Sequence, residues 1–346
     1  MDIEAVLRTA VERHASDVHL TVECPPVLRI HGDLVRLDGR PLTPGEVDGA
    51  LKALCRQEHL ERFNASGQVD FSYSIAGLSR FRVNAFRQRG STAICMRVLS
   101  SQMPTLAWLS LPPVVGDLAS REHGLVLVTG ATGSGKSSTL AAMINAINET
   151  KAYHVITLED PIEYLHRHQR SIINQREVGS DTRSYADGVR AALREDPDVI
   201  VIGELRDLET TTTAMAAAET GHLVLSTLHA TSASQAVDRV VDIFPLDHRE
   251  QAYRHLARVL EGVVSQQLIP RARGPGRAVA CEVLIANPDV RAMIRDGDSR
   301  GLRDAIDAGA KFGMKAMASS IAELHTMGVI SEDEFRVRMA AAMSGQ

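Results

Sequence analysis

Apolar and polar positions follow one pattern in the first hundred residues and another in the rest of the chain. The pattern in the rest of the chain is the simpler of the two. Four short runs of almost continuous apolar residues occur there, at residues 125–128, 154–158, 199–202 and 223–228. Segments of helical period separate these runs, near residues 139–148, 184–194 and 208–220. Short buried strands that alternate with helices predict a mostly parallel sheet covered on both faces. Ligands of such sheets bind at the carboxyl ends of the strands.

The first hundred residues instead mix helical periodicity with strand alternation. An apolar helical face spans residues 3–11, and Thr43 with Glu46 forms a capping box for a second helix. Strand-like runs occur at residues 27–30, 34–35, 69–75, 80–86 and 94–99. This mixture predicts a small α+β domain with an antiparallel sheet.

Together these patterns predict an α/β protein of two domains. We expect the α+β domain over residues 1–100, a linker containing proline and serine over residues 101–115, and the parallel-sheet domain over residues 116–346. The segment from about residue 275 to the end has a helical period, so we expect helices there. Ser331 and Glu334 are expected to cap the last helix.

Composition narrows the class of protein. A length of 346 residues suffices for two cores, and a net charge of −5 gives no global reason to expect a nucleic acid partner. The four cysteines are far apart and form no C-x-x-C pair, which indicates reduced thiols in a cytosolic protein. No apolar run approaches the ~20 residues that span a bilayer, and the N-terminus lacks a signal-peptide pattern. We therefore expect a soluble protein whose membrane contact is peripheral.

The run GATGSGKSS follows the apolar strand at residues 125–128 and precedes a helical segment, which is the context of a phosphate-binding P-loop. Its glycines let the backbone turn its N–H groups toward phosphate oxygens, and the helix N-terminus favours negative charge. Lys136 can reach the β- and γ-phosphates, and the Ser137 hydroxyl can bind Mg²⁺. The expected ATP-binding residues are Gly130, Thr132, Gly133, Ser134, Gly135, Lys136, Ser137 and Ser138.

Three further strand ends carry residues suited to nucleotide hydrolysis. Glu159 and Glu163 follow the second apolar run, Glu204 follows the third, and His222 and His229 flank the fourth. Hydrolysis needs an acid near Mg²⁺, a carboxylate that handles water and a group that senses the γ-phosphate. Each of these side chains alone is more often a solvated loop residue or a satisfied core residue. Their joint occurrence at strand ends beside a P-loop favours the functional interpretation.

Family resemblance adds to this interpretation. The runs ITLEDPIEYLH, VIGELRDLETT and GHLVLSTLHATSASQAVDRVVDIFP resemble the Asp box, Walker B and His box of the type II/IV secretion ATPase superfamily. Within it, the runs ASDVHL, RFRVNAF, INQREVG, ALREDPD and SQQLIP resemble the PilT-like retraction (twitching motility) ATPases of type IV pili. The resemblance covers nearly the whole chain.

The resemblance implies a PAS-like N-terminal domain followed by a RecA-like ATPase domain in a ring-shaped homo-hexamer. It also implies a motor that withdraws pilins from the pilus base and acts at the cytoplasmic face of the inner membrane. Its implied partners are an inner-membrane pilus platform protein and a paralogous retraction ATPase.

Carried over by position, the resemblance gives each candidate residue a role. Lys136 and Ser137 hold phosphate and Mg²⁺, and Glu204 becomes the Walker B acid, which reaches the metal directly or through water. Glu163 becomes the general base. His222 and His229 become His-box residues that link the nucleotide to the neighbouring domain.

The resemblance also implies a role for Arg80 and Arg82 on the N-terminal domain. They share one parity on their strand with Asn84 and Phe86, so both point the same way. The resemblance makes them candidates to reach the γ-phosphate of a neighbouring subunit, without saying which one does so. The alternative is a solvated basic face on a half-exposed strand.

Several alternatives remain open at this point. The run DVRAMIRDG at residues 289–297 stands where retraction ATPases usually read AIRNLIRE, and Ala292 replaces the asparagine. An accessory retraction paralogue would share every catalytic motif. Assembly ATPases of pili or type II secretion usually add an N-terminal domain and a four-cysteine zinc element, neither of which the sequence indicates. A P-loop phosphotransferase and a nucleotide-dependent DNA pump are the alternatives from other classes.

Overall fold

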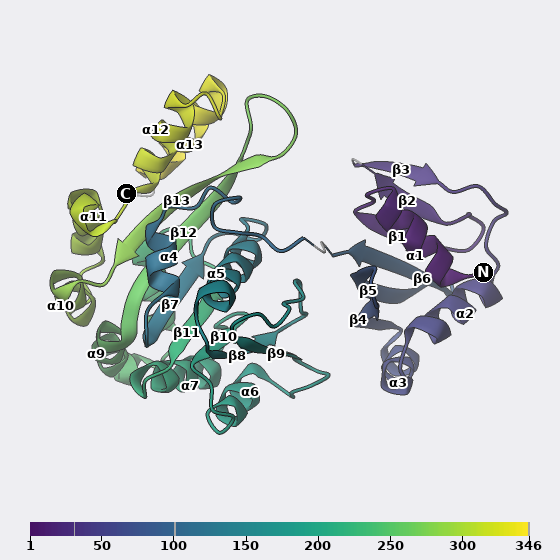
Figure 1. Cartoon of the computed structure of the whole chain (residues 1–346), viewed down its shortest axis with the longest axis horizontal. Helices are drawn as coiled ribbons and strands as arrows, with labels where there is room; N and C mark the ends of the chain where they lie inside the picture. The colour runs from purple at the N-terminus through teal and green to yellow at the C-terminus, as the bar shows by residue number, and fades with distance from the viewer. Residues whose placement is uncertain (31, 100–101, 345–346) are drawn as a thin grey trace. The chain divides into compact units, whose positions relative to one another are not determined.

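The computed structural model describes residues 1–30, 32–99 and 102–344, and the chain forms two compact units (Figure 1). The first comprises Met1–Met103 together with the short loop Pro161–Leu165. The second comprises Pro104–Asp160 and His166–Gln346. Each unit has its own hydrophobic core.

The first unit is an α+β structure with an antiparallel sheet, as the strand alternation predicts. In the described residues the sheet has six strands in the order β3-β2-β1-β6-β5-β4. The strands are β1 (Asp17–Leu20), β2 (Val27–Ile30), β3 (Asp33–Arg36), β4 (Gln68–Ile75), β5 (Ser79–Gln88) and β6 (Ser91–Val98). The helices are α1 (Ile3–Glu12), α2 (Pro44–Leu54) and α3 (Gln57–Ser66).

Local signals set the helices of this unit. Asp2 caps α1 by accepting a hydrogen bond from the Ala5 amide, and Ile3, Leu7 and Ala10 form its buried face. The expected capping box opens α2, because the Glu46 carboxylate accepts hydrogen bonds from the Thr43 amide and hydroxyl. These helices bury their apolar faces in the core of the first unit.

The second unit is built on a larger, mostly parallel sheet. Over the described residues it has seven strands in the order β13-β12-β7-β11-β10-β8-β9. The strands are β7 (Gly124–Thr129), β8 (His154–Glu159), β9 (Ile172–Glu177), β10 (Val199–Ile202), β11 (Leu223–Leu228), β12 (Leu260–Pro270) and β13 (Arg277–Ile285). Every residue of β7, β10 and β11 is buried, so both faces of the sheet are covered, as the apolar runs predict.

Helices follow most strands of this unit. They are α4 (Val114–Ala119), α5 (Lys136–Thr150), α6 (Tyr185–Ala192), α7 (Leu208–Glu219), α8 (Ala233–Asp242), α9 (Arg249–Val259), α10 (Pro288–Asp296), α11 (Ser299–Ala308), α12 (Met317–Thr326) and α13 (Glu332–Ser344), with 3-10 turns η1 (Leu246–His248) and η2 (Ala310–Phe312). The cap expected for the last helix forms, because the Glu334 amide donates to the Ser331 hydroxyl at 3.3 Å. Among the described helices, none is both long and apolar enough to cross a bilayer.

The expectation of helices from about residue 275 is wrong for its first part. Residues 277–285 form β13, which pairs antiparallel with β12, and the first helix of this segment begins at Pro288. The run from Ala278 to Ile285 is short and almost continuously apolar, a pattern that fits either a buried helix or a strand. Pairing with β12 makes this run a strand. Helical periodicity in the sequence does not reveal the turn between β12 and β13 that brings the two strands together.

A glycine on β12 provides a test of this packing. At Gly262 a Cβ would lie 2.7 Å from Leu118 Cδ2 and 2.9 Å from the Leu284 carbonyl oxygen. Gly262→Ala should therefore lower the free energy of unfolding by about 1–3 kcal/mol, which is typical of overpacking. Urea titration of the full chain measures the change.

Gly116→Ala is the matched control in the same unit. There a Cβ would lie 3.4 Å from Leu106 Cδ1, an ordinary contact, and alanine favours the helix α4. The control should unfold at the same or a higher urea concentration. A Gly262→Ala protein as stable as this control would contradict the tight approach of β12 to α4.

Candidate active site

The P-loop connects the end of β7 to the start of α5 and has the backbone that a phosphate cradle requires. Gly130, Gly133 and Gly135 have φ values of 146°, 78° and 93°, which side chains rarely tolerate. A Cβ at Gly130 would also collide with the Gln266 carbonyl oxygen and the Ser134 hydroxyl. The loop therefore opens onto the N-terminus of α5, a fifteen-residue helix whose free N–H groups favour anions.

The polar side chains of the loop suit a phosphate ligand. Lys136 Nζ donates to the carbonyl oxygens of Gly130 at 2.9 Å and Ala131 at 3.0 Å, which keeps the ammonium group over the loop. Ser134 is buried, and its hydroxyl has no hydrogen-bond partner among the described residues. Thr132 on the loop and Ser137 in the first turn of α5 are exposed. Phosphate oxygens accept hydrogen bonds from all these group types, so the residues present fit the phosphates of a nucleotide.

Glu204 lies just beyond the end of β10 and joins two other polar side chains. Its Oε2 is 2.7 Å from Arg206 Nε, and its Oε1 is 3.3 Å from His229 Nε2. The carboxylate is only 14% exposed, so the two neighbouring groups offset the cost of removing it from water. The hydrogen bond to Glu204 also raises the pKa of Arg206 above its ordinary value. The structure thus brings Glu204 and His229 together, and it adds Arg206.

Glu159, at the end of β8, is a second carboxylate of this edge. Its Oε1 accepts hydrogen bonds from the Thr157 hydroxyl at 2.6 Å and the Gln175 amide at 2.9 Å. Both donors lie on β8 and β9, so the sheet itself orients this carboxylate. Its role as a group that handles water stays a prediction.

Tyr185, the first residue of α6, lies among these carboxylates. Burial raises the pKa of the Tyr185 phenol, and the negative charges of Asp160, Glu204 and Glu159 add to the increase. A Cβ at position 203 would lie 2.7 Å from the Tyr185 hydroxyl, so Gly203 leaves space for it. The phenol therefore remains a protonated hydrogen-bond donor near neutral pH.

His222, one of the expected site residues, does not lie at this edge of the sheet. His222 precedes β11 and lies at the opposite end of that strand from His229, which is roughly 20 Å away for six residues of strand. Its ring Nδ1 lies 3.0 Å from the Ala217 carbonyl oxygen. The structure therefore does not bring His222 to the P-loop edge within one chain.

Glu163 belongs to the loop Pro161–Leu165, which groups with the first unit. Its role as general base stays a prediction.

Arg80 and Arg82 lie on β5 of the first unit, with Arg82 exposed and Arg80 partly exposed. The intervening Phe81 and Val83 are fully buried, so the two arginines share the outer face of the strand. Arg80 also donates to the Ser74 hydroxyl at 3.3 Å. Their action on a neighbouring subunit stays a prediction.

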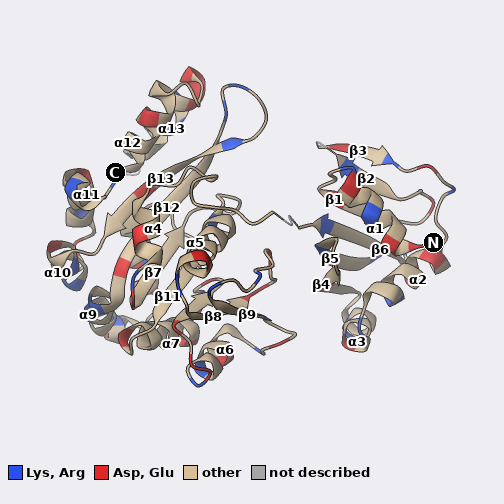
Figure 2. Cartoon of the chain, viewed as in Figure 1, with Lys and Arg blue, Asp and Glu red and all other residues tan. Residues whose placement is uncertain are grey.

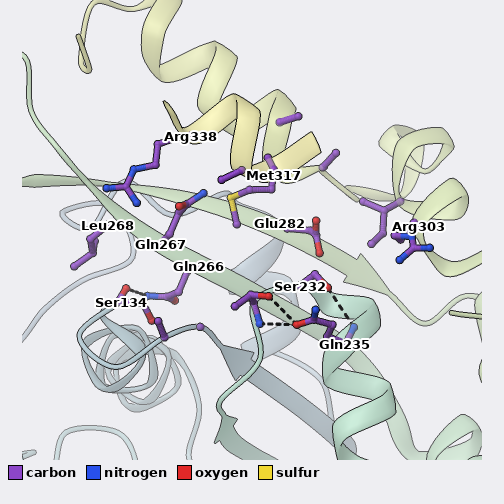
Figure 3. A pocket seen from close by; sticks show the side chains of 18 of the residues that line it. Ser134, Ser232, Gln235, Gln266, Gln267, Leu268, Glu282, Arg303, Met317 and Arg338 are labelled. Carbon is purple, nitrogen blue, oxygen red and sulfur yellow. Dashed lines mark hydrogen bonds between the residues drawn. The ribbon is translucent and has the colours of Figure 1, made fainter. Parts of the chain in front are cut away.

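A cavity of about 550 Å³ adjoins the P-loop on the side of β12 and β13 (Figure 3). Residues 130–134 form one wall, and Glu282, Arg303, Met317 and Arg338 contribute from β13 and the C-terminal helices. Burial raises the pKa of the Glu282 carboxyl, although hydrogen bonds from the Ala233 and Met317 amides oppose this effect. A cavity of this size beside a phosphate cradle has room for a small ligand.

The sequence reasoning missed Arg206, Tyr185 and Gln266, which all contact site residues. Arg206 stands two positions after Glu204 in the run GELRD, and this spacing could have indicated that the two side chains meet. Tyr185 and Gln266 gave no such signal, because their contacts with Gly203 and the P-loop are set by the packing of distant segments.

The family model described as Type II/IV secretion system protein matches residues 1–327. The chain is similar to the type IV pilus retraction ATPase PilT of Pseudomonas aeruginosa, with 41% identity over 97% of both chains. It is 39% identical to the type IV pilus ATPase PilU of the same organism, over 96% of this chain and 87% of that protein. The crystal structure of the pilus retraction motor PilT with bound ADP matches with a TM-score of 0.90 and 45% identity, over 98% of this chain and 97% of that one.

Substitutions at this edge should separate nucleotide binding from hydrolysis. Lys136→Ala removes the ammonium group that is expected to contact the β- and γ-phosphates. Both ATP binding and ATP turnover should therefore be nearly abolished. Glu204→Gln keeps the shape of the side chain and removes its charge, so ATP should still bind while turnover falls strongly, because the metal that neutralises the phosphates loses a charged ligand. Phosphate release and binding of a fluorescent ATP analogue measure the two effects. Normal turnover in the Glu204→Gln protein would contradict the assignment.

Proposed function

The chain belongs to the type II/IV secretion system protein family, and on that premise we propose that it is a Mg²⁺-dependent motor that retracts type IV pili. The chain is an ATPase of the pilus and secretion class. The single observation that carries the finer proposal is 41% identity, over 97% of both chains, to a type IV pilus retraction ATPase.

In the proposed reaction, the chain's own residues bind ATP and orient water. Lys136 exchanges the carbonyl oxygens of Gly130 and Ala131 for the β- and γ-phosphates, where its charge offsets theirs. Ser137 and Glu204 are the residues that would hold Mg²⁺, and the metal would supply further neutralisation of charge on the phosphates. Carboxylate and hydroxyl oxygens are ligands that this hard cation prefers.

Other residues of the chain would complete the reaction. His229, in contact with Glu204, is suited to respond to the state of the γ-phosphate. Glu163 would take a proton from the attacking water, with Glu159 as the second candidate for that role. Arg206 would keep the Glu204 carboxylate oriented, since its Nε donates directly to it.

We further propose that the motor is a ring-shaped homo-hexamer with shared active sites. Arg80 and Arg82 would then extend from the outer face of β5 to the γ-phosphate bound by a neighbouring subunit. The support is their common orientation on a partly exposed strand, together with the need of P-loop ATPases for a cation at the transferred phosphate.

A mixing experiment tests the shared site. The Arg80→Ala/Arg82→Ala protein should be inactive alone, and doping it with inactive Lys136→Ala subunits should restore part of the ATPase activity. Mixed interfaces then combine an intact P-loop with intact arginines. Arg36→Ala on β3 removes another exposed arginine of the same unit and should leave the activity unchanged.

Activity is measured under conditions in which rings exchange subunits, verified with two fluorescent labels. A mixture no more active than its separate components would show that the arginines act within one subunit or are structural.

Retraction competes with two related functions. Against an assembly ATPase stands the absence of a zinc element in the sequence, since the four cysteines are free and far apart. An accessory retraction ATPase is favoured by Ala292, which replaces the asparagine that retraction ATPases usually carry in the segment 289–297. That segment forms α10, where Val290 and Ile294 are fully buried, so its apolar spacing serves packing in this chain.

The proposed place of action is the cytoplasmic face of the inner membrane, where the motor would act on a pilus platform protein. A nucleic acid partner is not part of the proposal. Acidic and basic side chains are interspersed along helices of the second unit instead of forming one basic face (Figure 2).

Deletion of the gene tests the direction of work. The deleted strain should carry excess surface pili and should not twitch, because filaments still assemble but are not withdrawn. Electron microscopy and a motility assay measure both traits, and complementation with the Lys136→Ala variant should fail while the wild-type gene succeeds. Cells without pili would instead indicate an assembly motor, and normal pili with normal twitching would indicate an accessory paralogue.

A further inference from the structure

Gln266 on β12 lies directly against the P-loop, although it is 130 residues distant in the sequence. Its amide nitrogen donates to the Ser134 carbonyl oxygen at 2.7 Å (Figure 3), and its amide oxygen accepts from the Thr139 hydroxyl at 2.9 Å. The side chain is only 3% exposed. One residue thus connects the loop to the first turns of α5 from the side of the neighbouring strand.

The register of the sheet explains this contact. β12 runs parallel to β7 and pairs Ser265 with Thr129, the last residue of β7, so Gln266 lies beside Gly130, the residue that follows the strand. A Cβ at Gly130 would collide with the Gln266 carbonyl oxygen, and one at Gly135 would lie 3.1 Å from its amide nitrogen. Two glycines of the P-loop are therefore packed against this one residue.

From this geometry we propose that Gln266 is a positioning residue that holds the P-loop in its phosphate-binding shape. The inference rests on the proposed nucleotide site and deepens it. The amide makes its described contacts with the protein, so Gln266 acts on the nucleotide through the loop. Without it, the Ser134 carbonyl group and the Thr139 hydroxyl lose buried partners, and the loop relaxes from the arrangement in which its N–H groups converge.

The side chain must be an amide to serve both contacts. A leucine of similar size offers neither donor nor acceptor. A glutamate keeps the acceptor toward Thr139 but turns a second acceptor toward the Ser134 carbonyl oxygen, where two oxygen atoms would repel each other. Gln266→Leu and Gln266→Glu should therefore both weaken nucleotide binding while they preserve the volume of the packed side chain.

The test measures the affinity of the full chain for Mg-ADP by calorimetry, together with kcat and KM for ATP. Gln266→Leu should raise the Kd for ADP about tenfold, an effect typical of buried polar groups that lose a partner. KM should rise similarly, whereas kcat at saturating ATP should change much less, because bound phosphates restore the loop. Ser265→Ala, a buried change one position earlier on the same strand, should leave all three values unchanged.

Thr139 provides an independent route to the same contact. Thr139→Val removes one of the two hydrogen bonds and should raise the Kd for ADP about threefold. Thr139→Ser keeps the hydroxyl group, so its Kd for ADP should equal that of the wild-type chain. In the double variant, the effects of Gln266→Leu and Thr139→Val should be less than multiplicative, because the two residues share one hydrogen bond.

The outcomes separate this inference from the proposed function. If the Gln266→Leu and Thr139→Val variants bind ADP as tightly as the wild-type chain, the positioning role is overturned and the proposed ATPase function is not affected. A lowered melting temperature with unchanged Kd would also overturn it, since it would show a purely structural residue. If Gln266→Leu fails to fold, Gln266→Glu and Thr139→Val decide by the same criterion. A wild-type chain that binds no nucleotide would instead overturn the proposed site itself.

Discussion

Parallel pairing in a shared register is the constraint on which the active-site edge depends. β7, β11, β10 and β8 are neighbours in the sheet, and their registers align Thr129 with Leu228 and Ile202 with both Ser226 and Leu158. Because β7, β10 and β11 are buried along their whole length, polar chemistry begins only where these strands end. The P-loop, the acids and the histidine of the edge therefore gather within one layer of loops.

Polar partners satisfy the charged groups of this layer before any nucleotide enters. Glu204 is largely buried and contacts both Arg206 and His229, while Lys136 is held by loop carbonyl oxygens. A buried carboxylate without such partners would be costly, and so would an ammonium group. In the proposed function, phosphates and a metal ion would replace or engage these same partners. Glycine positions such as Gly203 leave the space that the arrangement needs.

The sequence predicted the features that depend on local signals. These include the P-loop, the capping box at Thr43, and the alternation of strands and helices that forms the parallel sheet. It failed where distant segments decide the outcome. Residues 277–285 become a strand because β12 pairs with them, and Gln266 reaches the P-loop because β12 pairs with β7. His222 precedes β11, so it lies at the edge of the sheet opposite the P-loop, and its His-box role stays a prediction. Motif and period do not report which strands pair with each other.

The central claim is that the P-loop edge of this chain binds the phosphates of ATP for hydrolysis. A crystal structure of the chain with Mg²⁺ and a non-hydrolysable ATP analogue tests it most directly. The account predicts that Lys136 Nζ leaves the Gly130 and Ala131 carbonyl oxygens for the β- and γ-phosphates, with Ser137 and Glu204 facing the metal. A structure in which Lys136 keeps both carbonyl contacts while the phosphates lie elsewhere would contradict it.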